Sequence, residues 1–220
     1  NTYLVVLDGD SGALGQIDQV FPLFGLSFGS NGYLVLLQNG SPYTAAGGTN
    51  VQTASGVGWN GLNGSTTVIA STSFENSSSS FLLVTAASPP VANGDADTTE
   101  DGLLDVSWTI LDSIGILDAS GGAVDRAYST AVFRNLTGDG LALTGTIADV
   151  PFVGPTSYVA RLGNSTGTVP SDWVASVASG TPPTLFLGNP DTSPSNIAGL
   201  PINHLGADNT AAPNMAPVID

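Results

Sequence analysis

The sequence predicts an all-β protein, a β-sandwich with long loops rich in glycine, serine and aspartate. Three features of the chain point to this class. Apolar residues occur in strand-sized blocks enriched in β-branched and aromatic side chains. Turn residues separate the blocks, and the chain is rich in them, with 28 glycines and 14 prolines. Residues that favour helices are scarce, because glutamate occurs only at Glu75 and Glu100 and lysine is absent.

The expected strands follow in chain order, and a short helical turn stands between two of them. Ser171 can cap a turn over residues 171–175, the only such signal in the sequence. Several apolar blocks run over consecutive rather than alternating positions, so we expect both faces of these strands to be buried. Loops, another sheet or a neighbouring molecule would cover the second face. The expected strands are 3–7, 33–37, 66–70, 81–85, 106–111, 127–133, 157–162 and 184–187.

The chain is long enough for one large β domain. We expect this domain to span residues 1–200, with a soft internal boundary at 86–93, where consecutive prolines interrupt the pattern. Residues 201–220 contain proline and no strand-like block. We expect them to form an extended tail that packs on the surface or on a neighbour. The chain begins at Asn1 without an initiator methionine, which is typical of a mature or processed product.

The composition excludes several classes of partner and chemistry. Eighteen acidic residues and only three basic ones, Arg126, Arg134 and Arg161, give a formal net charge of −15. Such a surface disfavours nucleic acid and anionic lipid, and it favours divalent cations or self-repulsion in solution. The absence of cysteine excludes disulfides and thiolate chemistry, and His204 alone cannot form a multi-histidine metal site. No apolar run reaches the roughly 18 residues of a membrane span.

Two stretches of the sequence resemble a known family. They contain YLVVLDGD at 3–10, IDQV at 17–20 and GLSFGSNGYLVL at 25–36, then WTILDSIG at 108–115 and DRAY at 125–128. These segments resemble secreted bacterial proteins with lamin-tail-like domains. The resemblance implies an immunoglobulin-like β-sandwich, an exported location, and a binding or structural role, sometimes beside hydrolases. Such domains begin with one or two strands before the one at 3–7, so we expect this strand to form an edge that another chain covers.

The strongest local pattern is an acidic loop over residues 93–105. When Asp97 is taken as the first position of a calcium-binding loop, every second residue as far as Asp105 offers an oxygen atom that can bind the ion. Gly102 then occupies the position where the chain of such a loop turns sharply. Trp108 replaces the bidentate glutamate of an EF-hand, so the pattern is that of a strand-borne aspartate loop. A solvated acidic turn is the alternative. The expected calcium ligands are Asp97, Thr99, Asp101, the carbonyl group of Leu103, and Asp105.

The remaining motifs lack the context that catalysis requires. Residues 163–167 match the G-x-S-x-G pattern of hydrolases, but Val169-Pro170 follows instead of a helix. Residues 56–61 match G-x-G-x-x-G outside any βαβ unit. We therefore predict no enzymatic activity. Trp59, Trp108 and Trp173 have rings of the kind that stack on sugars, but we expect them in the core or at its rim. The sequons Asn39, Asn63, Asn76, Asn135 and Asn164 are candidate glycan acceptors.

These features favour an exported, non-enzymatic structural protein that self-associates in a cell-surface layer, appendage or filament. Four features support it together: the low charge density, the absence of lysine, strands apolar on both faces, and an apparently missing amino-terminal edge. The first alternative is a calcium-dependent adhesion or carbohydrate-binding module with the loop from Asp97 to Asp105 as its site. The second is an accessory domain of a secreted hydrolase.

Overall fold

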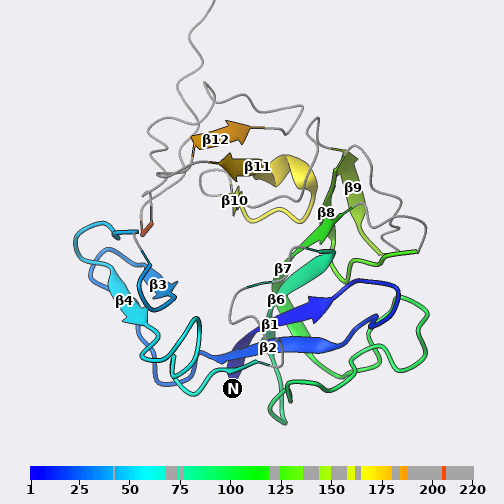
Figure 1. The fold of residues 1–220 in the computed structure, drawn as a ribbon, viewed down its shortest axis with the longest axis horizontal. Coiled ribbons are helices and arrows are strands. Elements are labelled where there is room, and N and C mark those ends of the chain that lie inside the picture. Colours follow the sequence, from blue (N-terminus) through cyan, green and yellow to red (C-terminus); the bar gives the residue numbers. More distant parts are fainter. Residues whose placement is uncertain are drawn as a thin grey trace, which may run out of the picture.

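The computed structural model describes residues 1–41, 43–67, 74, 77–118, 124–135, 144–149, 158–161, 165–179, 184–187 and 205–206. Strands make up almost all of the regular structure in these ranges, which confirms the predicted all-β class (Figure 1). The strands are β1 Thr2–Asp8, β2 Ile17–Pro22, β3 Leu34–Leu37, β4 Asn50–Thr53, β5 Thr66–Thr67, β6 Ser79–Thr85, β7 Thr109–Leu117, β8 Ala131–Arg134, β9 Thr146–Asp149, β10 Tyr158–Arg161, β11 Trp173–Ser179 and β12 Thr184–Leu187.

A seven-stranded sheet forms the centre of the molecule, with the strand order β5-β2-β1-β6-β7-β8-β9. The strands from β5 to β7 are antiparallel neighbours, whereas β7, β8 and β9 are parallel. A three-stranded sheet, β10-β11-β12, and a parallel pair, β3-β4, complete the described fold. No helix in the described part of the chain is long and apolar enough to cross a bilayer.

The prediction that residues 3–7 form an exposed edge is wrong. Strand β1 lies inside the sheet, where Val5 faces Val20 of β2 on one side and Leu82 of β6 on the other. The sequence pattern missed β2 because Asp18 and Gln19 interrupt its apolar residues, although both side chains are buried. The chain therefore supplies the neighbours of its own first strand.

The two faces of the sheet are both apolar, as predicted. Tyr3 and Val5 point into one cluster, which Leu104, Val106 and Trp108 of the long loop after β6 cover. Leu4, Val6 and Phe21 belong to the opposite face with Trp59 and Leu62. The second face is thus covered by segments of the same chain.

Two separate units cover this second face. Residues of the β3–β4 region pack on β1 and β2, and residues of β10 and β11 pack on β7 and β8. Phe81 of β6 contacts both clusters and so marks the boundary between them. Figure 1 shows the β3–β4 pair and the β10–β12 sheet at different places along the central sheet.

The helical turn and residues 205–206 of the predicted tail both contact the rest of the described fold. A 3-10 turn spans Pro170–Asp172, one residue earlier than predicted, and β11 begins immediately after it. Within the predicted tail, Leu205 bridges Ala45, and the carbonyl oxygen of Gly206 accepts a hydrogen bond from Asn31 Nδ2 at 3.0 Å. The predicted boundary at 86–93 contributes Ala86 and Ala92 to the main core cluster.

Candidate functional site

Asp97 is the centre of the acidic loop. Its side chain is fully buried, and its Oδ2 atom accepts hydrogen bonds from the Gly102 N–H at 2.7 Å and the Tyr128 hydroxyl at 2.8 Å. Its Oδ1 atom accepts from the Asp101 N–H at 3.2 Å. Gly102 turns with a φ of 83°, which glycine adopts without strain. The carboxylate therefore holds the loop closed around itself.

Two of the other predicted calcium ligands, Asp105 and Asp101, make hydrogen bonds of their own within the loop. Asp105 Oδ2 accepts from the Thr98 hydroxyl at 2.6 Å and from the Thr99 N–H at 3.0 Å. Asp101 Oδ1 accepts from the Leu103 N–H at 2.9 Å. Within the described residues, no three acidic or histidine side chains converge as metal ligands do. Calcium binding by this loop stays a prediction.

Tyr128 links the acidic loop to the central sheet, and the sequence pattern did not single it out for this role. Burial raises the pKa of its hydroxyl well above the ordinary value, and the hydrogen bond to Asp97 and the charges of Asp97, Glu100 and Asp95 act in the same direction. The tyrosine therefore remains a neutral donor toward Asp97. The Thr98 hydroxyl in turn lowers the pKa of the exposed Asp105 carboxyl.

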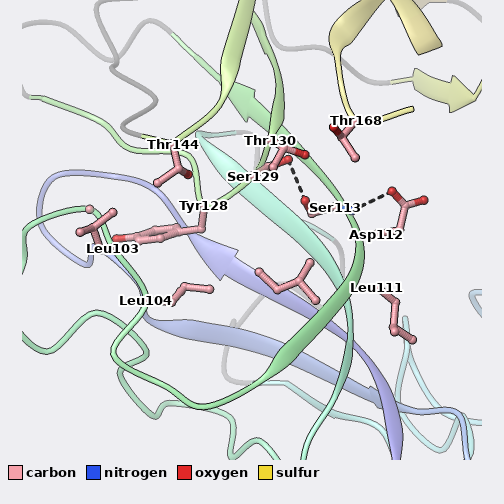
Figure 2. Close-up of a pocket in the computed structure, with 12 residues that line it drawn as sticks. Leu103, Leu104, Leu111, Asp112, Ser113, Tyr128, Ser129, Thr130, Thr144 and Thr168 are labelled. Carbon is pink, nitrogen blue, oxygen red and sulfur yellow. Dashed lines mark hydrogen bonds between the residues drawn. The ribbon is translucent and has the colours of Figure 1, made fainter. Parts of the chain in front are cut away.

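A pocket of about 320 Å³ lies beside Tyr128, between the acidic loop and β7 (Figure 2). Strand β7 carries a bulge here, because Leu83 and Val84 of β6 face Asp112 and Ile110 and leave Leu111 between them. Bulges redirect side chains and are common beside binding sites. The pocket is lined by Gly102, Leu103, Leu104, Ile110, Leu111, Asp112, Ser113, Tyr128, Ser129, Thr130, Thr144 and Thr168.

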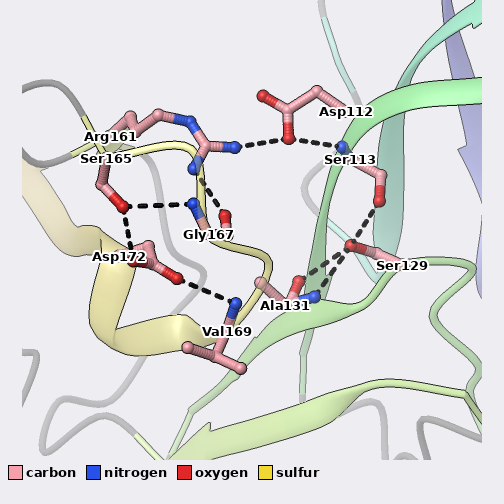
Figure 3. A network of polar contacts seen from close by, with 9 residues as sticks. All are labelled: Asp112, Ser113, Ser129, Ala131, Arg161, Ser165, Gly167, Val169 and Asp172. Atoms are coloured by element: carbon pink, nitrogen blue, oxygen red, sulfur yellow. Dashed lines mark hydrogen bonds and ion pairs between the residues drawn. The ribbon is translucent and has the colours of Figure 1, made fainter.

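An arginine fixes one wall of this pocket (Figure 3). Arg161 Nη2 donates to Asp112 Oδ1 at 2.5 Å, and Arg161 Nη1 donates to the Gly167 carbonyl oxygen at 2.7 Å. The guanidinium carbon lies 4.1 Å from the centroid of the Trp173 ring, a cation–π distance. These contacts tie β10 and the loop before η1 to the bulge in β7.

The serine of the G-x-S-x-G pattern belongs to a turn next to this arginine. Ser165 donates to Asp172 Oδ1 and accepts from the Gly167 N–H at 3.3 Å, while Asp172 Oδ2 accepts from the Val169 N–H at 3.1 Å. The Ser165 hydrogen bond lowers the pKa of the Asp172 carboxyl. His204 lies outside the described residues. These bonds give Ser165 a structural role in the turn.

A larger apolar groove, of about 750 Å³, runs along the second face of the central sheet. Its floor includes Leu4, Phe81 and Leu83, and its wall includes Leu34 and Leu36 of β3. Phe28 stands at the groove with 74% of its surface exposed. Aromatic rings line one end: the Trp59 ring centroid lies 5.2 Å from that of Phe21 and 5.3 Å from that of Phe74.

Two of the predicted glycan acceptors, Asn63 and Asn135, use their side-chain amides in hydrogen bonds within the fold. The side-chain amide of Asn63 donates to the Pro22 carbonyl oxygen at 2.7 Å. Asn135 is buried and its amide donates to Asp118 Oδ1. Asn76 and Asn164 lie outside the described residues. A glycan on Asn63 or Asn135 would replace one of these contacts.

Comparisons with protein-family models, curated proteins and solved structures find no match to this chain. The likeness to lamin-tail-like proteins therefore rests on the quoted residues alone.

Proposed function

We propose that this protein is an exported, non-enzymatic structural module whose copies associate through the apolar groove in a surface layer, appendage or filament. The observation that carries the proposal is the groove with Phe28 exposed at its edge. An apolar groove with an exposed aromatic side chain at its edge is a form that protein contact sites take. The resemblance to secreted lamin-tail-like proteins supports the exported location.

A second copy is the partner that fits this groove. The residues lining it are apolar apart from Thr2 and Ser27, so two acidic molecules can meet there without opposing carboxylates. A two-fold contact would place Phe28 of each copy in the groove of the other and would pair the copies, and a second contact elsewhere would join the pairs into a layer or filament. A large aromatic side chain in a desolvated hollow is the usual energetic centre of such an interface.

The charge distribution also favours an apolar contact over interchain ion pairs. Arg134 donates to Asp149, and Arg161 donates to Asp112, so two of the three cations are already used within the chain. The net charge of −15 makes copies repel one another at low salt. At physiological ionic strength, dissolved salt limits the distance over which this repulsion acts to about 8 Å.

Sedimentation velocity over a range of protein concentrations tests the proposal. We expect a concentration-dependent shift to larger species, stronger in high salt, and we expect Phe28→Ser to abolish it. Val57→Ser is the matched control, because Val57 is 72% exposed and lies outside the groove. A monomer at every concentration and salt level, or equal assembly of both variants, would refute self-association through this groove.

A further inference from the structure

We propose that the pocket beside Tyr128 binds a neutral, polyhydroxylated ligand of the sugar class. This inference rests on the pocket alone and is independent of self-association through the groove. The pocket presents hydroxyl groups and one carboxylate on one side and aliphatic surface on the other (Figure 2). A sugar ring has the same two-sided character, with hydroxyl groups around its edge and C–H groups on its faces.

The polar side of the pocket holds groups that the protein itself leaves available. The hydroxyl groups of Thr130, Thr144 and Thr168 make no hydrogen bond to any residue that the structure describes. Asp112 uses Oδ1 for Arg161 and for the Ser113 N–H at 3.0 Å, whereas Oδ2 has no hydrogen bond among the described residues. A ligand with several hydroxyl groups can both donate to the carboxylate and exchange hydrogen bonds with the threonines.

The apolar side comes from the β7 bulge and the acidic loop. Ile110 and Leu111 are each about half exposed at this site, and Leu104 lies beside the Tyr128 ring. The Tyr128 hydroxyl is committed to Asp97 and only 3% of the residue is exposed, so the tyrosine closes the base of the pocket without a polar tip. The exposed apolar surface is therefore aliphatic, from Leu103, Ile110 and Leu111, and it can pack against the C–H face of a sugar.

The electrostatics select a neutral ligand. Asp112 is the one carboxylate among the described residues that line the pocket, and Arg161 already balances its charge. An anionic sugar would meet Asp112 and a chain of net charge −15. A cation gains little from a carboxylate that is already paired. The pocket therefore excludes uronates and phosphosugars more strongly than neutral sugars.

The surrounding contacts hold the polar groups in place before a ligand arrives. Arg161 bonds both Asp112 and the carbonyl oxygen of Gly167, the residue before Thr168 (Figure 3). Ser129 donates to Ser113 at 3.1 Å and accepts from the Ala131 N–H at 3.3 Å. Such preorganisation lowers the entropy lost on binding.

Protein-observed NMR titration with methyl glucoside, methyl galactoside, methyl N-acetylglucosaminide and glucuronate tests the proposal. We expect at least one neutral glycoside to bind with a Kd on the order of 1 mM and to shift signals around Asp112 and Thr168. Glucuronate should bind more weakly. Thr168→Val should weaken the binding about three- to tenfold, because one hydrogen bond is lost.

Thr166→Val is the matched control, since Thr166 is an exposed threonine of the same loop outside the pocket. It should bind like the parent protein. The inference is overturned if no neutral glycoside binds, if glucuronate binds best, if both variants bind alike, or if the shifted signals surround Phe28 instead. Phe28→Ser leaves sugar binding unchanged, which separates this inference from the proposed assembly.

Discussion

At the scale of single residues, Asp97 shows how a buried carboxylate can organise a loop. Three donors surround it, and removing the carboxylate would leave two of them, the Gly102 N–H and the Tyr128 hydroxyl, buried without this acceptor. We expect Asp97→Ala to lower the free energy of unfolding by about 3 kcal/mol. Asp101→Ala is the control and should cost less than about 1 kcal/mol, because Asp101 is exposed and bonds only the nearby Leu103 N–H. Urea unfolding measures both, and equal losses would contradict this role.

Tyr128 should make the fold sensitive to alkali. Its pKa is raised in the folded state, so its contribution to stability is complete below the ordinary tyrosine value of 10.0 and is lost as the pH rises above that value. We expect the melting temperature to fall above about pH 10. Tyr128→Phe should lower stability at neutral pH and flatten part of the alkaline decline. An unchanged alkaline decline in this variant would assign the effect to other groups.

Gly9 offers a steric test at the turn after β1. A Cβ atom at this position would lie 2.2 Å from the carbonyl oxygen of Arg126, a backbone atom that cannot move aside cheaply. We expect Gly9→Ala to destabilise the fold by about 1–3 kcal/mol. Gly12→Ala is the control, since a Cβ atom there meets nothing within 4 Å. Thermal unfolding distinguishes them, and similar melting temperatures would show that the close approach is not retained in solution.

At the scale of elements, the sequence predicted the strongly apolar strands and missed those with polar residues. The blocks at 3–7 and 81–85 became β1 and β6, which alternate between two buried faces. The sequence pattern did not predict strand β4, Asn50–Thr53, because its apolar and polar residues alternate over only four positions and two of them are amides. The segment from Trp173 was expected to be helical. It forms β11 because pairing with β10 and β12 outweighs a one-turn capping signal.

The acidic loop allows a direct test of calcium binding. Asp101 and Asp105 are exposed on a loop that also carries Asp95 and Glu100, so a bound cation would relieve the repulsion among these carboxylates. We expect calcium at about a hundred times its Kd to stabilise the fold by about 2.7 kcal/mol, and we expect a chelator to reverse this. Identical melting temperatures in calcium and in chelator would refute the prediction.

At the scale of the whole molecule, the candidate sites were less predictable than the fold. The acidic loop is contiguous, so its residues are visible as a pattern in the chain. The pocket instead combines the loop at 102–104, the bulge at 110–113, and Thr168, which are distant in sequence. A bulge has no signature in the pattern of β7, and the partner of Arg161 depends on how β10 packs on the sheet. Only tertiary structure brings these groups together.

The groove has a whole-molecule consequence for solution behaviour. Because the net charge is −15 and the contact surface is apolar, we expect association to strengthen as sodium chloride concentration rises. Light scattering at constant protein concentration measures this dependence. Association through interchain ion pairs would weaken in salt, so weakening would rule out the apolar contact.

The position of β1 has a mechanical consequence. The strand that starts at Thr2 is hydrogen-bonded along its length to β2 and β6, both antiparallel to it. A pulling force directed along β1 would load the bonds to both neighbours in shear, so that many must rupture at nearly the same extension. A force applied across the strands would instead break the bonds one after another. Strand β1 is therefore a firm point of attachment for tension along its axis, which would suit the load-bearing assembly proposed above.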